Sequence, residues 1–206
     1  MDVLGGISRS QVEPLIKELA DRLSQQGVYA HLRLIGGSAL LLQDVTTRLT
    51  HDIDAVPPVG DPLWNQWPIL EETVNDIGGR YGLGPQWLNK NAAMFVPANA
   101  EWETIICSHI LTLEVASVET LLAMKVCSDR RKDVLDIRLL LQRLGLQGSP
   151  ESAIDLTYRI YGDDPVNLNH DREYYLSKMQ AICDSIATGN SSPQPQPDNR
   201  GPYLSI

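Results

Sequence analysis

The sequence predicts an α+β fold in which a mixed β-sheet is flanked by helices. Three observations lead to this prediction. Apolar residues three and four positions apart, as on one side of a helix, occur near both ends of the chain. Strand-like stretches lie between them, separated by glycine and proline. A length of 206 residues with 43% apolar residues suits one core domain and a small helical appendage.

The first part of the chain is expected to contain two helices and two strands. They are a helix over 10–26, a strand over 29–35, a short helix beginning at 39–42 and a strand over 52–56. Gly27 ends the first helix, and Gly36-Gly37 should form the turn between the first strand and the short helix. Pro57 ends the second strand, because proline cannot donate to the next ladder hydrogen bond.

The middle of the chain is expected to be rich in strands. The predicted elements are a helix over 63–77, a loop over 78–84, strands over 93–96, 104–107 and 111–116, and a helix that follows Ser117. Four glycines predict the loop, and serine is a residue type that caps helices.

Helices should dominate the last third of the chain. They are expected over 131–144, 150–161 and 171–186. After residue 188 the chain is rich in Pro, Gln, Asn and Ser, and it buries too little apolar surface to offset the entropy lost on ordering. The predicted organisation is a core at 1–117, a helical subdomain packed on it at 118–187, and a flexible tail at 188–206.

Charge and composition exclude several classes of protein. A net charge of -9 disfavours general binding to nucleic acid or to acidic membranes. Residues 125–143 are locally basic, with six Lys or Arg against three Asp, and could hold a polyphosphate or an RNA end or form a solvated helix surface. Three scattered cysteines indicate neither a zinc cluster nor a disulfide framework. Without a signal-like N-terminus or an apolar stretch near the roughly 20 residues that span a bilayer, a cytoplasmic protein is expected.

The stretch LIGGSALLLQDVTTRLTHDIDAV, residues 34–56, carries the clearest chemical pattern. Alternate side chains of a strand share a face, so Asp52 and Asp54 should lie together, with Ile53 in the core. Such a pair repels unless a cation shares it, and Mg²⁺ or Mn²⁺ takes carboxylates together with substrate phosphates.

The glycine turn in the same stretch suggests a phosphate cradle. Gly36 and Gly37 let backbone N–H groups approach a phosphate, and Ser38 adds a hydroxyl donor. Alone, a Gly-Gly turn is most often only a turn, and an Asp-x-Asp pair is more often solvated or helix-capping than metal-binding. Their combination favours phosphoryl or nucleotidyl transfer by positioning and charge stabilisation.

Two segments resemble a known superfamily. GGSALLL followed by TRLTHDID resembles the nucleotidyltransferases with a DNA polymerase β-like fold, whose signature is a glycine turn and then D-x-D. VASVETLLAMKVCSDRRKDVLDIRLLL resembles a block of their AbiEii-type branch, which belongs to type IV toxin–antitoxin systems. WLN at 87–89 is similar to uncharacterised bacterial relatives. The resemblance covers about residues 10–180.

The resemblance implies a minimal nucleotidyltransferase core that binds an NTP with Mg²⁺ at Asp52 and Asp54. The nucleotide-binding residues that it implies are Gly36, Gly37, Ser38, Lys125, Arg130 and Asp133. Lys125 would face the triphosphate, although a solvated lysine at a helix end is as good an interpretation. Arg130 with Asp133, and Lys132 with Asp136, can also form plain surface ion pairs.

A third carboxylate on a neighbouring strand is usual in active enzymes of this superfamily, where it helps to hold the metals. Glu103 and Glu114 are the candidates, and either could equally be a surface residue. The leading hypothesis is an Mg²⁺-dependent enzyme that transfers an NMP to a tRNA, another RNA or a protein, as a toxin with an antitoxin partner. The alternative is a non-catalytic nucleotide-sensing or protein-interaction module of the same fold, and nothing speaks for a third option, a phosphate hydrolase.

Overall fold

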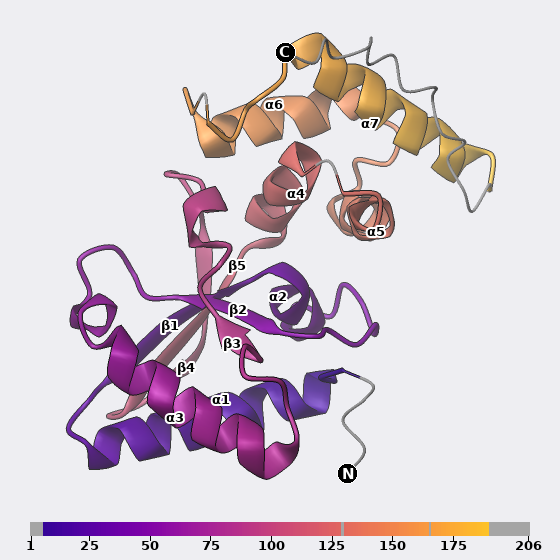
Figure 1. Cartoon of the computed structure of the whole chain (residues 1–206). Coiled ribbons are helices and arrows are strands. Elements are labelled where there is room, and N and C mark those ends of the chain that lie inside the picture. The colour runs from indigo at the N-terminus through magenta and orange to yellow at the C-terminus, as the bar shows by residue number, and fades with distance from the viewer. Residues whose placement is uncertain (1–5, 129, 165, 190–206) are drawn as a thin grey trace, which may run out of the picture.

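The computed structural model describes residues 6–128, 130–164 and 166–189. At its centre is a five-stranded sheet with the strand order β3-β2-β1-β5-β4 (Figure 1). The strands are β1 (Ala30–Ile35), β2 (Ile53–Val56), β3 (Leu88–Asn89), β4 (Trp102–Cys107) and β5 (Leu111–Ala116). β1 is parallel to β5 and antiparallel to β2, β3 is parallel to β2, and β4 is antiparallel to β5. The predicted α+β class with a mixed sheet is confirmed.

Helices lie against the sheet and beyond one of its ends. They are α1 (Arg9–Gln25), α2 (Gly36–Leu42), α3 (Trp67–Tyr81), α4 (Val118–Cys127), α5 (Asp133–Leu144), α6 (Pro150–Tyr161) and α7 (Arg172–Ala187), with 3₁₀ turns η1 (Pro62–Trp64) and η2 (Ala93–Phe95). α1 and α3 lie side by side along the sheet, whereas α4 to α7 gather beyond the end at which β5 stops (Figure 1).

The two faces of the sheet differ in polarity. Leu32, Leu34 and the other inward side chains are fully buried in one core cluster with the apolar sides of α1 and α3. The opposite face carries Arg33, Asp54 and Glu114, which are half-buried. Asp54 is level with Ile35, and Arg33 with Glu114, and residues paired in register project to the same face. The polar face is therefore the one on which a substrate can meet Asp54.

The C-terminal helices continue directly from the sheet. Ser117 follows β5 and caps α4, with its hydroxyl accepting a hydrogen bond from the Thr120 N–H at 3.1 Å. Lys178 of α7 donates to the carbonyls of Val126 and Ser128, at 2.9 and 2.7 Å, and so closes the other end of α4. Buried side chains of these helices join the same core cluster as the sheet. A domain boundary at residue 117 stays a prediction.

The predicted strand over 93–96 is wrong. Residues 93–95 form the 3₁₀ turn η2, and the strand of this region, β3, lies earlier and has only two residues. A strand that short has no alternating pattern long enough to be recognised.

The predicted loop over 78–84 is also wrong in its first half. α3 continues through Gly78 and Gly79 to Tyr81, and the chain leaves the helix at Gly82, whose φ is 66°. A Cβ at position 78 would lie 3.0 Å from Trp87 Cδ1, so this glycine serves close packing within the helix rather than a turn.

Two further predictions concern membrane-spanning helices and the C-terminal tail. In the described part of the chain, no helix is long and apolar enough to cross a membrane. The predicted flexible tail lies outside the described residues from position 190 onward, and Thr188 and Gly189 follow the end of α7.

Candidate metal and nucleotide site

Two carboxylates and one amide share a place on the polar face of the sheet. Asp54 lies within β2, and Asp52 immediately precedes the strand. Asn89 of β3 is the register partner of Asp54, and its side-chain amide lies 3.4 Å from Asp52 Oδ2, to which it donates. Asn89 was not predicted as a site residue, because a two-residue strand gives no sequence signal.

Asp54 occupies an electrostatically unfavourable position. Burial and, second, the neighbouring Asp52 carboxylate raise the pKa of Asp54 to about 6, against the opposing influence of Arg130, Lys125 and Lys132. A divalent cation that prefers oxygen ligands fits this donor set, since it would share both negative charges. No group of three or more His, Cys, Asp or Glu side chains in the described residues could hold a metal ion. A cation at the pair would therefore take its other ligands from water and substrate, as Mg²⁺ commonly does.

The glycine turn packs tightly against the carboxylate strand. Gly36 has a φ of 65°, and a Cβ there would lie 2.8 Å from Asp54 Oδ2. A Cβ at Gly37 would lie 2.6 Å from Thr50 Oγ1. The hydroxyl of Ser38 is buried and donates to the Ile35 carbonyl at 3.1 Å, so it holds the turn itself. These contacts explain why α2, a helix of seven residues, begins with two glycines.

The segment that precedes Asp52 is held by hydrogen bonds to the N-terminal segment and to α5. Thr50 exchanges backbone hydrogen bonds with Ile7, at 2.6 and 3.0 Å, and its hydroxyl donates to the Asp52 carbonyl at 2.9 Å. Arg48 donates to both carboxylate oxygens of Asp136 in α5, at 2.9 and 3.1 Å. The carboxylate pair is thus tied to the N-terminal segment and to the C-terminal helices.

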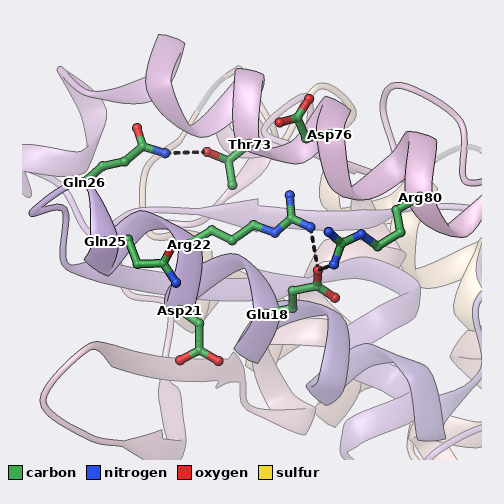
Figure 2. Close-up of a pocket in the computed structure, with 8 residues that line it drawn as sticks. All are labelled: Glu18, Asp21, Arg22, Gln25, Gln26, Thr73, Asp76 and Arg80. Atoms are coloured by element: carbon green, nitrogen blue, oxygen red, sulfur yellow. Dashed lines mark hydrogen bonds and ion pairs between the residues drawn. The ribbon is translucent and has the colours of Figure 1, made fainter.

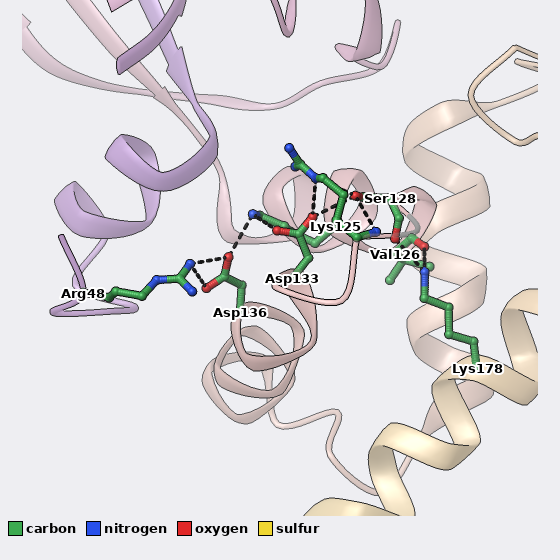
Figure 3. A network of polar contacts seen from close by, with 8 residues as sticks. Arg48, Lys125, Val126, Ser128, Asp133, Asp136 and Lys178 are labelled. Atoms are coloured by element: carbon green, nitrogen blue, oxygen red, sulfur yellow. Dashed lines mark hydrogen bonds and ion pairs between the residues drawn. The ribbon is translucent and has the colours of Figure 1, made fainter. Parts of the chain in front are cut away.

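A buried ion-pair network links α4 and α5 to this segment (Figure 3). The ammonium of Lys125 lies 2.6 Å from Asp133 Oδ1 and 2.8 Å from Asp136 Oδ2, and only 7% of the residue is exposed. Asp133 also accepts hydrogen bonds from Ser128 and Arg130, at 2.7 and 2.9 Å. Burial raises the pKa of Asp133, but the hydrogen bonds from Lys125 and Ser128 outweigh it and hold this pKa below its usual range.

The network changes the roles expected for the basic residues. Lys125 faces two buried carboxylates, which occupy the ammonium that was expected to meet a triphosphate. The Arg130–Asp133 pair forms, whereas Asp136 pairs with Lys125 and Arg48 in place of Lys132. Arg130 and Lys132 are exposed, and both act electrostatically on Asp54. The sequence indicated Lys132 only within a basic run and as a possible partner of Asp136, not as a residue that acts on Asp54.

Neither candidate for a third carboxylate joins the pair. Glu103 is level with Val115, a buried residue of the apolar face, so it does not project to the face of Asp54. Glu114 lies on the polar face, but it accepts a hydrogen bond from Arg33 Nε at 2.7 Å and lies 3.0 Å from His31 Nε2. Burial raises the pKa of Glu114, and these two partners more than reverse that effect.

A groove between α1 and α3 is separate from the carboxylates (Figure 2). Its two arginines, Arg22 and Arg80, both pair with Glu18, at 2.7 and 3.0 Å. Gln26 donates to Thr73 Oγ1 across the same groove at 3.4 Å. These five polar side chains therefore pair with one another within the groove, on the helices that cover the apolar face.

Comparison with known proteins finds one family. The family model described as "Nucleotidyltransferase of unknown function (DUF6036)" matches residues 11–148. This range includes most of α1, the whole sheet, the carboxylate pair and the buried network of α4 and α5. No curated protein and no solved structure matches the chain.

Replacing Gly36 by alanine should disturb the site more than the same change at Gly27. Both glycines have a left-handed φ, but a Cβ at Gly27 meets nothing within 4 Å. The backbone cost of about 1 kcal/mol is common to both, so the excess for Gly36→Ala, roughly 1–3 kcal/mol in the free energy of unfolding, reports the contact with Asp54. Equal costs in urea denaturation would contradict this packing.

Asp54→Asn should stabilise the metal-free protein at neutral pH. The raised pKa means that the folded state binds an extra proton between about pH 4 and pH 6, so the folded protein loses stability as the pH rises through that range. Removing the charge should add about 1–3 kcal/mol to the free energy of unfolding above pH 6, and nothing below about pH 4. Asp76→Asn, at an exposed position on α3, is the control. A loss of thermal stability in Asp54→Asn at pH 7 would argue against repulsion within the pair.

Lys125→Met should be far more damaging to stability than Lys132→Met. The first change leaves Asp133 and Asp136 buried without their shared cation, which typically costs about 3–5 kcal/mol. The second removes an exposed side chain and should change the free energy of unfolding by less than about 0.5 kcal/mol. Similar values for the two variants would show that Lys125 does not hold the network.

Proposed function

The chain belongs to the family of nucleotidyltransferases of unknown function (DUF6036), and we propose that it transfers a nucleoside monophosphate from an NTP to an acceptor hydroxyl. One observation carries this proposal. The carboxylates of Asp52 and Asp54 lie together on an accessible sheet face, in the electrostatic reach of two exposed cations, Arg130 and Lys132. Such a site can bind a polyphosphate only with a cation between the two sets of negative charges.

Asp52 and Asp54 are the residues proposed to hold Mg²⁺ or Mn²⁺. The bound ion would supply Lewis-acid stabilisation of the charge that develops on the phosphates. Arg130 and Lys132 are proposed to receive the β- and γ-phosphates, Lys132 with its exposed ammonium and Arg130 with the part of its guanidinium that does not bind Asp133. Gly36, Gly37 and Ser38 form the first turn of α2, in which Gly36 packs against Asp54, while Lys125 and Asp133 hold α4 and α5 in place.

The proposed reaction forms one bond and breaks one. The oxygen of the acceptor hydroxyl bonds to the α-phosphorus, the bond from that phosphorus to the bridging α–β oxygen breaks, and pyrophosphate leaves. The hydroxyl proton passes to water. The protein contributes orientation and fixed charges to this displacement, the two terms on which such transfers chiefly depend.

The acceptor and the biological role are finer proposals. The resemblance to AbiEii-type enzymes supports an RNA acceptor such as tRNA, or a protein acceptor, together with a toxin role and an antitoxin partner. The transfer assay below distinguishes RNA from protein labelling.

A second candidate function rests on the third carboxylate. Glu103 projects to the other face, and Glu114, which shares the face of Asp54, is held by Arg33 and His31, so neither of these two acids joins the pair. This arrangement favours a module that binds nucleotide without turnover. Such a module would bind NTP and release no pyrophosphate.

Incubation with each NTP labelled at the α-phosphate, Mg²⁺ and either total tRNA or a cell extract tests the proposal. The parent protein should label a macromolecule and release pyrophosphate, and Asp52→Ala and Asp54→Ala should each reduce labelling by at least about 100-fold. Asp76→Asn should label as well as the parent. Nucleotide binding without transfer to any acceptor would establish the non-catalytic module, and equal labelling by all variants would refute the role of the pair.

A further inference from the structure

The only phenylalanine of the chain is half exposed, within a small apolar patch. Phe95 and Met94 of η2 are 50% and 68% exposed, and Val166, from the segment that follows α6, is 72% exposed. The two segments adjoin, because Tyr161 donates to the Phe95 carbonyl at 3.0 Å and Asn167 to the Met94 carbonyl at 3.4 Å. We call Met94, Phe95 and Val166 the apolar platform.

Buried polar groups fix the backbone of this platform. Burial raises the pKa of Tyr161, so its hydroxyl stays protonated and donates to the Phe95 carbonyl. The Asn167 amide also donates to Asp164 Oδ2 at 2.7 Å. Asp164 Oδ1 in turn accepts from the N–H groups of Val166 and Asn167, at 3.0 and 3.1 Å. Exposed apolar side chains on a backbone held this firmly are suited to contact with a ligand, since little freedom is lost on binding.

The platform lies beside the strand that carries the carboxylates. η2 packs against β2, within the segment that leads from β3 at one edge of the sheet to β4 at the other. In Figure 1 this segment and α5 lie on different sides of α4. The carboxylate strand therefore has the η2 segment of the platform packed against it and the charges of Arg130 and Lys132 acting on its Asp54.

We propose that the apolar platform binds the nucleobase of the nucleoside triphosphate, by stacking on Phe95 and by contact with Met94 and Val166. Tyr161 and Asn167 are its positioning residues. This inference rests on the proposed function and adds the site of the base to the site of the phosphates. Stacking on an aromatic ring favours the binding of any of the bases, because every base has a π-face.

The size of the platform favours a base over a protein partner. A stable protein interface buries about 800 Å² on each side, with 20–30 residues, whereas three side chains offer a surface of the order of one heterocycle. The platform also adjoins β2, whose carboxylates are the proposed position of the phosphates.

Binding of ATP, GTP, CTP and UTP, each compared with inorganic tripolyphosphate in the presence of Mg²⁺, tests the proposal by calorimetry. Phe95→Ala should weaken the binding of NTPs by about 5- to 150-fold and leave tripolyphosphate unchanged, because only the NTPs carry a base. Phe95→Trp should restore NTP binding. Tyr161→Phe should also weaken the binding of NTPs and leave the binding of tripolyphosphate unchanged. A general loss of stability would weaken both. Val166→Ala should reduce NTP affinity, and its matched control Val59→Ala, at a position 98% exposed, should not.

The remaining outcomes overturn the inference. Unchanged NTP binding in Phe95→Ala would leave the platform as a protein-contact surface, and an equal loss for NTP and tripolyphosphate would show a general disturbance of the site. Equal affinity of the parent protein for NTPs and tripolyphosphate would refute the base site and leave the proposed function unaffected. A parent protein that binds neither compound would remove both the proposed function and this inference.

Discussion

Repulsion between the carboxylates of Asp52 and Asp54 is the constraint on which the site depends. Two like charges stay together only if the surrounding structure fixes them or a cation shares them. The protein fixes them from several directions, with the Gly36 backbone against Asp54 and with Thr50 bound to both Ile7 and the Asp52 carbonyl. Burial and, second, the charge of Asp52 raise the pKa of Asp54 to about 6, and a divalent cation is the ligand proposed to stabilise the ionised pair.

The charged residues around this pair form a buried group and an exposed group, and the two groups have different functions. Lys125, Asp133 and Asp136 are buried and satisfy one another, so they hold α4 and α5 in place and, through Arg48, the segment that leads to Asp52. Arg130 and Lys132 are exposed, and although Arg130 also pairs with Asp133, both side chains can meet a polyanion at the surface. A protein with a net charge of -9 can thus attract a polyphosphate locally, and a cation at the pair would be needed to complete the attraction.

Sequence reasoning found the elements whose signal is local and missed the contacts that depend on the fold. The strand over 111–116 and the helix over 150–161 were predicted with their observed bounds, because alternation, spacing and a Ser-Pro start specify them. β3 has two residues and Gly78 serves packing against Trp87, so neither was recognisable. The sequence also could not show that Asp136 selects Lys125 and Arg48 over Lys132 four residues earlier, because that choice depends on how α5 packs against α4 and the segment before β2.

The most direct test of a cation-binding nucleotide site at Asp52 and Asp54 is a crystal structure with Mn²⁺ and an NTP analogue whose α–β bridge cannot be cleaved. The account predicts an anomalous Mn²⁺ peak in contact with carboxylate oxygens of both aspartates, with the phosphates between that peak and the side chains of Arg130 and Lys132. Mn²⁺ and nucleotide bound elsewhere on the molecule, with the two aspartates free of metal, would contradict it.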